Sequence, residues 1–233
     1  SEMCIRDSIK PLMKETTYED DSLVQEPGTL EVSHVSFAYP GGEKIYEDFN
    51  LSATPGQIIG VTGAVACGKS TLGKTFLCEY PYEGRICFHG KELSGMTKAE
   101  QNGMVGYLGH DPELFNDSVR NNILLGDDDD PEKYLKAVCF DGEVAEMEEG
   151  MDTIVGNGGV RLSGGQAQRL ALARTLCHKR PVLILDDPFS ALDRKTEEEV
   201  FANLRKFTAD SIVILLSHRL YMFPQMDQVL WME

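Results

Sequence analysis

Three absences narrow what this 233-residue sequence can be. No stretch approaches the ~18 consecutive apolar residues that a membrane-spanning helix needs, and the longest apolar run is Ile212 to Leu216. Basic residues are few, with 22 Lys and Arg against 38 Asp and Glu, a formal net charge of −16. Nucleic acids and anionic membranes require basic patches, so we expect no nucleic-acid partner. The six cysteines form no close pairs at metal-ligand spacing, which predicts reduced thiols in a cytosolic protein.

The two ends of the chain differ from its middle. Residues 1–27 are polar, acidic around Glu19 and without clear periodicity, and we interpret them as a linker or tail. The sequence stops within an expected strand, Gln228–Met232, so we expect a fragment whose C-terminus is truncated. Residues 28–233 are long enough for one substantial domain.

Between these ends, short apolar segments alternate with helical patterns. Uninterrupted apolar strands between helices indicate an α/β fold with a parallel sheet covered on both faces. The expected strands are 30–37, 49–51, 58–61, 85–88, 105–107, 182–185, 212–216 and 228–232. The expected helices are 69–78, 118–124, 131–140, 165–177 and 196–207. The four aspartates 127–130 are expected to form a solvated loop.

A glycine-rich segment, Gly63-x4-Gly68-Lys69-Ser70, follows one of these strands and precedes a helix. Glycines let backbone N–H groups close around phosphates without a Cβ in the way. Lys69 is expected to reach the β and γ oxygens and the Ser70 hydroxyl to ligate Mg²⁺. The sequence therefore predicts a site for a nucleoside triphosphate, ATP with Mg²⁺.

Two aspartates follow the apolar strand 182–185. A strand of this kind delivers Asp186 to its polar end, where a carboxylate can hold Mg²⁺, and Asp187 stands where a carboxylate would polarise an attacking water. Two acids after a buried strand can also be only a helix cap, so the assignment depends on the glycine-rich segment.

A second anion-binding end is expected at the helix that begins in Leu162-Ser163-Gly164-Gly165-Gln166. A serine cap and two glycines at a helix N-terminus leave backbone N–H groups free for an anion. One chain cannot easily aim this end and the glycine-rich segment at the same phosphate.

With these three segments the sequence resembles the ATP-binding cassette (ABC) ATPases over residues 28–233. The resemblance implies a P-loop NTPase core with a mostly parallel sheet, an N-terminal antiparallel β subdomain and an inserted α-helical signature subdomain at about 111–178. It also implies a second cassette as partner, because two cassettes of this family sandwich two ATPs. Each ATP then lies between one glycine loop and the other chain's signature, here Leu162, Ser163, Gly164, Gly165 and Gln166.

The resemblance assigns further roles. Tyr39 matches the aromatic that stacks on adenine, with an exposed turn residue before Pro40 as the alternative, and His218 matches the switch histidine that contacts the γ-phosphate. The ATP-binding residues it implies are Tyr39, Gly63, Ala66, Cys67, Gly68, Lys69, Ser70 and Thr71. The residues of the loop that crosses the dimer interface are Ser190, Ala191, Leu192 and Asp193.

Two stretches are similar to exporter sequences of the family. Residues 153–159 resemble a loop that touches transmembrane coupling helices, and residues 114–123 resemble the stretch after the γ-phosphate sensor. They favour an exporter of peptide, lipid or drug, whose transmembrane domain would precede residues 1–27. The cassette would then lie at the cytoplasmic face of the cell membrane.

Two positions depart from the family pattern. The base after Asp186 is normally glutamate, and here it is Asp187, whose carboxylate lies about 1.5 Å further back. The γ-phosphate-sensing glutamine falls at His110. Altered bases with an intact signature are typical of one half of a heterodimeric exporter, so we hypothesise that this chain builds the slow site and completes its partner's fast one.

Two alternatives remain open at this point. The chain could be a module that holds ATP and barely hydrolyses it, as Asp187 and His110 allow. It could also be a soluble cassette of DNA repair or the ribosome. Repair-type relatives carry a coiled-coil insertion that this sequence lacks, and ribosome-acting relatives carry basic linkers, whereas this chain is acidic.

Overall fold

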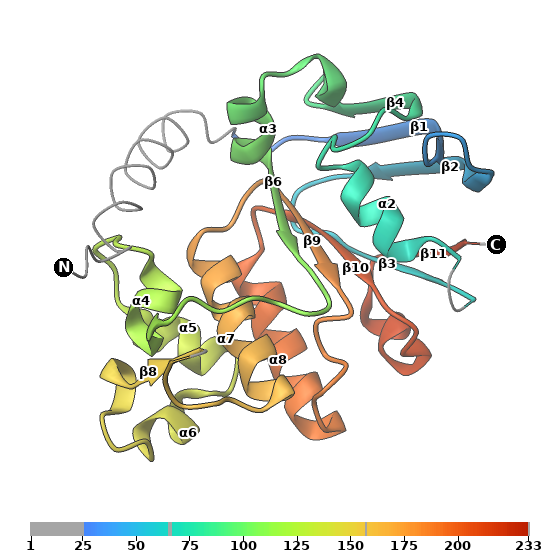
Figure 1. The fold of residues 1–233 in the computed structure, drawn as a ribbon. Helices are drawn as coiled ribbons and strands as arrows, with labels where there is room; N and C mark the ends of the chain where they lie inside the picture. Colours follow the sequence, from blue (N-terminus) through green and yellow to red (C-terminus); the bar gives the residue numbers. More distant parts are fainter. Residues whose placement is uncertain (1–25, 65–66, 157, 233) are drawn as a thin grey trace.

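A five-stranded parallel sheet lies at the centre of the molecule (Figure 1). The computed structural model describes residues 26–64, 67–156 and 158–232. In this sheet the strand order is β11-β3-β10-β9-β6. The strands are β3 (Ile58–Gly63), β6 (Val105–Leu108), β9 (Val182–Asp186), β10 (Ile212–Leu216) and β11 (Gln228–Met232).

The two central strands, β9 and β10, are apolar except for Asp186 at the end of β9, because each of their two faces is covered. Every residue of β9 and β10 is buried. Val182 and Ile184 join the core on the side of the antiparallel sheet, whereas Leu183 and Leu185 join the core on the side of the long helices. Alternate side chains therefore enter two separate cores, which confirms the parallel sheet covered on both faces.

An antiparallel sheet packs over one of these faces. Its strand order is β2-β1-β4-β5. Val32 and Phe37 of β1 share a core with Leu72 and Phe76 from the segment that follows the glycine-rich loop. The strands are β1 (Leu30–Ala38), β2 (Lys44–Ala53), β4 (Glu83–Phe88) and β5 (Lys91–Glu92). The expected N-terminal antiparallel part is thus present.

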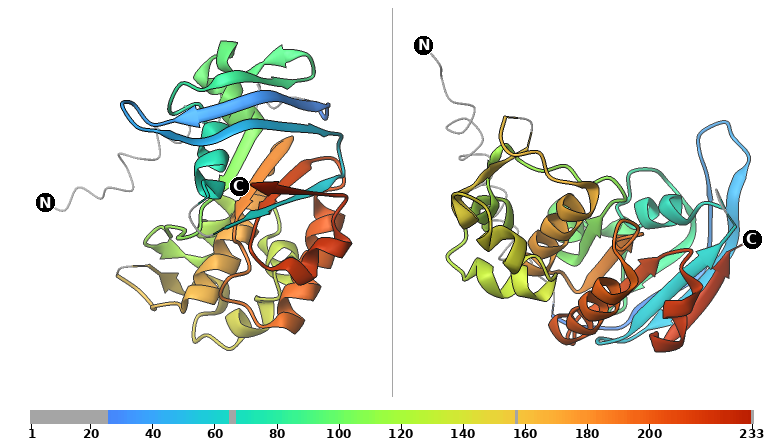
Figure 2. Two further views of the ribbon diagram at one scale, coloured as in Figure 1. Left: turned by 90° about the vertical axis from the view of Figure 1, so that its right-hand side faces the viewer. Right: turned by 90° about the horizontal axis from the view of Figure 1, so that it is seen from below.

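Helices cover the other face and continue into a helical part at the end of the molecule opposite the antiparallel sheet (Figure 2). The long helices are α7 (Gly164–Cys177) and α8 (Arg194–Phe207). The smaller elements are α4 (Val119–Leu124), α5 (Pro131–Ala137), α6 (Asp141–Ala145), β7 (Asp117–Ser118) and β8 (Ile154–Val155). Phe140 is fully buried between these helices and anchors them to the core.

Two helices end earlier than the sequence predicts. The helix after the glycine-rich loop, α2 (Lys69–Thr75), was expected to reach Cys78, and α5 was expected to reach Phe140. Both expectations are wrong by three residues. Cys78 has φ 51 and Cys139 has φ 53, a left-handed conformation in which an α-helix cannot continue.

The sequence analysis also missed α3 (Lys98–Met104) and α6. Thr97 and Glu100 form a capping box at the start of α3, a signal that the sequence does contain. Two of the four aspartates 127–130, expected to form a solvated loop, also stabilise α5. Asp130 caps this helix, and Asp129 accepts hydrogen bonds from Lys133 and Tyr134. The 3-10 helices are η1 (Leu93–Gly95), η2 (Gly150–Asp152) and η3 (Leu220–Gln225).

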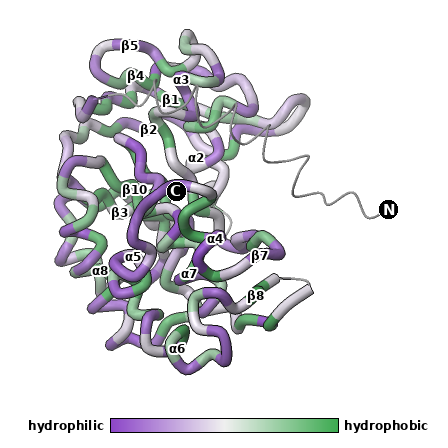
Figure 3. The backbone as a smooth tube through the Cα atoms, turned by 90° about the vertical axis from the view of Figure 1, so that its left-hand side faces the viewer, coloured by the Kyte–Doolittle hydropathy of each residue, from purple (hydrophilic) through white to green (hydrophobic). Residues whose placement is uncertain are grey.

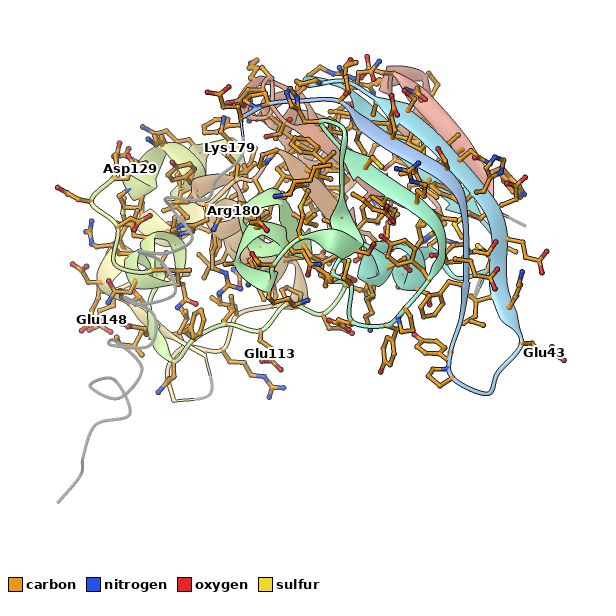
Figure 4. The ribbon with its side chains drawn as sticks, turned by 90° about the horizontal axis from the view of Figure 1, so that it is seen from above. Glu43, Glu113, Asp129, Glu148, Lys179 and Arg180 are labelled. Carbon is orange, nitrogen blue, oxygen red and sulfur yellow. The ribbon has the colours of Figure 1, made fainter. Side chains whose placement is uncertain are left out.

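The acidic surplus is spread over the surface. Figure 4 shows Glu43 at the tip of the β1–β2 hairpin and Glu148 on the helical part, far from each other. Both side chains are exposed. In the part of the chain that the structure describes, no helix has the length and apolar character that a membrane crossing requires.

Candidate nucleotide site

The candidate residues follow the carboxyl ends of four neighbouring parallel strands. The glycine-rich loop follows β3, His218 follows β10, Asp187 follows β9 and His110 follows β6. Leu216 of β10 lies opposite both Val61 of β3 and Asp186 of β9, so these strand ends are level. The carboxyl edge of an open parallel sheet is where such folds bind ligands. Segments that are far apart in the sequence therefore meet at one edge of the sheet (Figure 1).

The glycine-rich loop packs tightly against the antiparallel sheet. Gly68, just before α2, has φ 94, and a Cβ there would lie 2.5 Å from Cγ2 of Ile45. Only glycine suits both conditions. The Lys69 ammonium donates to the carbonyl oxygens of Gly63 (3.1 Å) and Ala64 (2.8 Å), which hold it over the loop.

The other residues expected to bind ATP here lie in the loop or in the first turn of α2. Cys67 is partly buried, and its Sγ lies 3.5 Å from Nζ of Lys69. Ser70 is exposed and Thr71 is partly buried, both in the first turn of α2. Ala66 lies outside the described residues.

Asp186 is the last residue of β9 and is 6% exposed. Its Oδ2 accepts a hydrogen bond of 3.2 Å from the hydroxyl of Tyr107 on β6. Burial, together with the negative charge of Asp186, raises the pKa of Tyr107, so its hydroxyl keeps its proton at neutral pH. A carboxylate and a serine hydroxyl are the hard oxygen ligands that Mg²⁺ prefers, so the chemistry of Asp186 and Ser70 fits such an ion.

The carboxylate of Asp187 lies beneath two exposed imidazoles. Its Oδ2 is 3.4 Å from Nδ1 of His218 and 4.0 Å from Nδ1 of His110. The Asp187 side chain is 11% exposed, against 65% for His218 and 53% for His110. Ser217 Oγ donates to the other carboxylate oxygen at 3.4 Å. The sheet thus gathers one acceptor and two titratable rings, groups that can orient a water molecule and exchange protons.

The backbone of Asp187 adopts an uncommon conformation. Its φ is 48, in the left-handed region, and its N–H donates to the carbonyl of Leu216 at 2.8 Å. Aspartate tolerates this region better than most residues. The hydrogen bond holds the turn after β9 against the end of β10.

Tyr39 lies at the start of the β1–β2 hairpin turn and is 39% exposed. Its ring meets those of Phe37 and Tyr80 edge to face, with centroids 5.0 Å and 5.4 Å away. Its carbonyl accepts the Gly42 N–H and closes the turn. Tyr39 is therefore both a turn residue and an exposed aromatic whose ring is held by two neighbours.

The signature segment forms the N-terminus of α7. Ser163 and Gln166 form a reciprocal capping box, with the Ser163 hydroxyl accepting the Gln166 N–H and the Gln166 side chain accepting the Ser163 N–H. Gln166 also donates to the carboxylate of Glu143 on α6 at 2.7 Å. Leu162 packs against the helical core, and a Cβ on Gly164 would have nothing within 4 Å.

The expected interface loop packs against the signature segment. A Cβ on Gly165 would come 2.9 Å from the carbonyl oxygen of Ala191. The side chain of Asp193 caps α8 by accepting hydrogen bonds from the N–H groups of Lys195 and Thr196. Ala191 is exposed, whereas Leu192 is buried. Two segments expected at a dimer interface thus share one surface.

Gln168 is a residue that the sequence analysis missed. It is 2% exposed, on the second turn of α7. Its Nε2 donates to the carbonyls of Asp187 (3.1 Å) and His110 (3.3 Å) and to the hydroxyl of Ser190 (3.2 Å). A polar side chain on the buried face of a helix is the only sequence signal that could have found it.

The two exporter-like stretches lie side by side. β7 pairs antiparallel with β8, and Gly158 N–H donates to the Asn116 side chain at 3.0 Å. Figure 3 labels the two segments next to each other. Three apolar side chains are exposed in these stretches or directly after them, namely Phe115, Ile154 and Val160. Asn157 lies outside the described residues.

Comparison with known proteins gives the following similarities. The family model described as "ABC transporter" matches residues 46–190. A probable multidrug resistance ABC transporter ATP-binding/permease protein of Bacillus subtilis is 36% identical over 90% of this chain and 37% of its own length. The ATP-dependent lipid A-core flippase of Pseudomonas aeruginosa is 35% identical over 97% of this chain and 39% of its own length.

A solved structure, that of a bacterial Atm1-family ABC exporter with ATP bound, superposes with a TM-score of 0.82. It is 30% identical, and the match covers 90% of this chain and 38% of that one. The chain therefore spans less than two-fifths of the length of each of these three proteins.

Proposed function

Because this chain belongs to the ABC transporter family, as a nucleotide-binding domain of exporter type, we propose that it binds ATP with Mg²⁺ at the carboxyl edge of the parallel sheet. Lys69 would bind the β and γ phosphates, and Asp186 and Ser70 would hold the metal ion. The observation that carries this proposal is the meeting of four strand ends, which places the glycine loop, both aspartates and both histidines together.

The same proposal gives this chain a part in a second nucleotide site. Ser163 and Gly165 lie at the N-terminus of α7, where backbone N–H groups can receive an anion. They adjoin Ala191 in the expected interface loop. We propose that a second cassette docks on this surface and that its ATP is closed by this signature.

We further propose that the chain is the slow-site half of a heterodimer. Asp187 is one methylene shorter than glutamate, and its carboxylate is engaged with Ser217 and faces two imidazoles. A base displaced by about 1 Å can lose on the order of a hundredfold in rate. The signature, by contrast, keeps its full motif and its capping box.

The cassette would power export through a transmembrane domain that precedes it, with residues 1–27 as the connection and residues 28–233 as the domain. This arrangement is supported by three exposed apolar side chains in or directly after the two paired stretches, those of Phe115, Ile154 and Val160, which a transmembrane domain would cover. The two relatives reported above are a probable multidrug resistance ATP-binding/permease protein and a lipid A-core flippase. The cassette itself would then lie at the cytoplasmic face of the membrane.

The proposal is tested by removing each base in turn. Asp187→Asn should leave most of the ATP turnover of the assembled pair, whereas replacing the partner's equivalent glutamate by glutamine should leave only the slow turnover of this chain's own site. Equal losses would refute the slow-site assignment, as would a homodimer of this chain that hydrolyses ATP at full rate. Turnover that stays undetectable with every partner cassette, while ATP still binds, would identify a module that only holds ATP.

A further inference from the structure

Arg219, the residue after the expected switch histidine, reaches across to the interface loop. Its guanidinium donates to the carbonyl oxygen of Ser190 at 2.7 Å and to that of Leu192 at 3.3 Å. These two carbonyls flank the exposed Ala191. The rigid fork of an arginine can hold two acceptors at once, which the single ammonium of a lysine does less well.

The charge of Arg219 is balanced by a buried acid. Glu197, in the first turn of α8, is 0% exposed and pairs with the Arg219 guanidinium, and it also accepts a hydrogen bond from Tyr221. Its other oxygen, Oε1, has no hydrogen-bond partner among the described residues. A buried carboxylate is costly without a cation beside it, so the Arg219 guanidinium stabilises Glu197 in the core.

Other contacts also hold the interface loop, including a hydrogen bond from the Leu192 N–H to the carbonyl of Phe189 at 3.0 Å. Asp193 caps α8, and the Ser190 hydroxyl bonds to Gln168 of α7. Between these anchors, the Arg219 side chain donates hydrogen bonds to the carbonyls of Ser190 and Leu192 on either side of Ala191. The Arg219 backbone in turn belongs to the segment that carries His218, since its N–H donates to Ser217 Oγ at 3.1 Å.

We propose that Arg219 is a positioning residue that couples the His218 segment to the interface loop Ser190–Asp193. The inference rests on the proposed function, in which His218 faces the nucleotide and the loop faces the partner cassette. A displacement of the His218 segment on ATP binding would move the guanidinium and, through its two carbonyl contacts, the backbone at Ala191. The nucleotide state of this chain would in this way reach the partner through the side chain of Arg219.

The test is carried out on the whole transporter with both cassettes present. Arg219→Lys keeps the charge beside Glu197 and removes the fork. We expect kcat for ATP to fall about tenfold or more, because the loop loses its alignment, and KM to stay within about twofold. Arg205→Lys is the matched control: Arg205 also joins a carboxylate, Asp227, to a carbonyl, that of Gln225, but it does not touch the interface loop.

A second variant separates positioning from stability. Arg219→Met combined with Glu197→Gln removes both charges together, so no buried carboxylate is left unpaired. We expect this double variant to unfold within about 5 °C of the wild type and still to show the reduced kcat. Recovery of kcat in the double variant, or equal effects of Arg219→Lys and Arg205→Lys, would overturn the inference.

Binding measurements keep this inference distinct from the proposed function. If the wild-type protein neither binds nor hydrolyses ATP, the proposed function itself fails. If the wild type does both and Arg219→Lys changes neither kcat nor ATP-driven association of the two cassettes, only the role of Arg219 is refuted.

Discussion

Lengthening Asp187 to glutamate adds one methylene between the backbone and the carboxylate of the candidate base. The carboxylate would move about 1.5 Å outward, from beneath the two imidazoles toward the exposed edge of the site. Its present oxygen lies 3.4 Å from His218 and 4.0 Å from His110. Both rings are more than half exposed, so they can give way to the longer side chain.

Two opposite effects follow from this substitution. A misplacement of about 1 Å can cost on the order of a hundredfold in rate, so Asp187→Glu should raise kcat at this site by about tenfold to a hundredfold. That gain corresponds to roughly 1.4 to 2.7 kcal/mol of transition-state stabilisation. Stability should fall, because residue 187 has φ 48 and glutamate tolerates the left-handed region less well than aspartate, at a cost of about 1 kcal/mol.

The assay is ATP turnover by the assembled pair in which the partner's base has been replaced, so that only this chain's site contributes. Asp48→Glu is the matched control, since Asp48 has φ 53 on an exposed hairpin and shares the backbone cost without touching the site. The reasoning would be refuted if Asp187→Glu bound ATP normally but hydrolysed it no faster than the wild type. An equal rate gain in Asp48→Glu would refute it as well.

Further predictions concern the glycine loop and the cysteines. Gly68→Ala should lower stability by about 2 kcal/mol and weaken ATP binding, because of φ 94 and the contact with Ile45. Gly142→Ala is the control: it lies in helix α6 with open space around it, so it should raise stability slightly and leave ATP binding unchanged. Burial raises the pKa of both Cys139 and Cys177 to about 11. At pH 8 their thiolate fraction is then roughly a hundredth of that of an ordinary thiol. Mass spectrometry after brief iodoacetamide treatment should therefore find both cysteines nearly unmodified. Rapid labelling of either cysteine in the native protein would contradict the burial.

The apolar pattern of the sequence predicts the buried strands of the fold. Strands such as Val182–Asp186 are continuous apolar runs because their side chains enter two cores, and this pattern is visible in one sequence. The early ends of α2 and α5 were not predictable in the same way. Each is followed by a cysteine with positive φ, at Cys78 and Cys139, and cysteine carries no preference for that conformation as glycine does.

Part of the candidate site could likewise be predicted from the sequence and part could not. The sequence predicts that Asp187 and His110 follow strands, and the structure places both at one edge of the sheet. The sequence does not predict that Gln168 and Arg219 contact the residues of the site and of the interface loop. These contacts join residues that are 19 to 58 positions apart in the chain. Such contacts depend on how α7 and the turn after β10 pack, which no local pattern specifies.

The contacts of Gln168 also explain how an altered base can coexist with an intact frame. Gln168 donates to the main-chain carbonyls of His110 and Asp187, not to their side chains. A change of side chain at either position therefore leaves these hydrogen bonds in place. Arg219 likewise holds the interface loop through carbonyls of Ser190 and Leu192. The frame that joins the signature helix, the nucleotide edge and the interface loop thus tolerates changes in the chemistry at 110 and 187, as the proposed slow site would require.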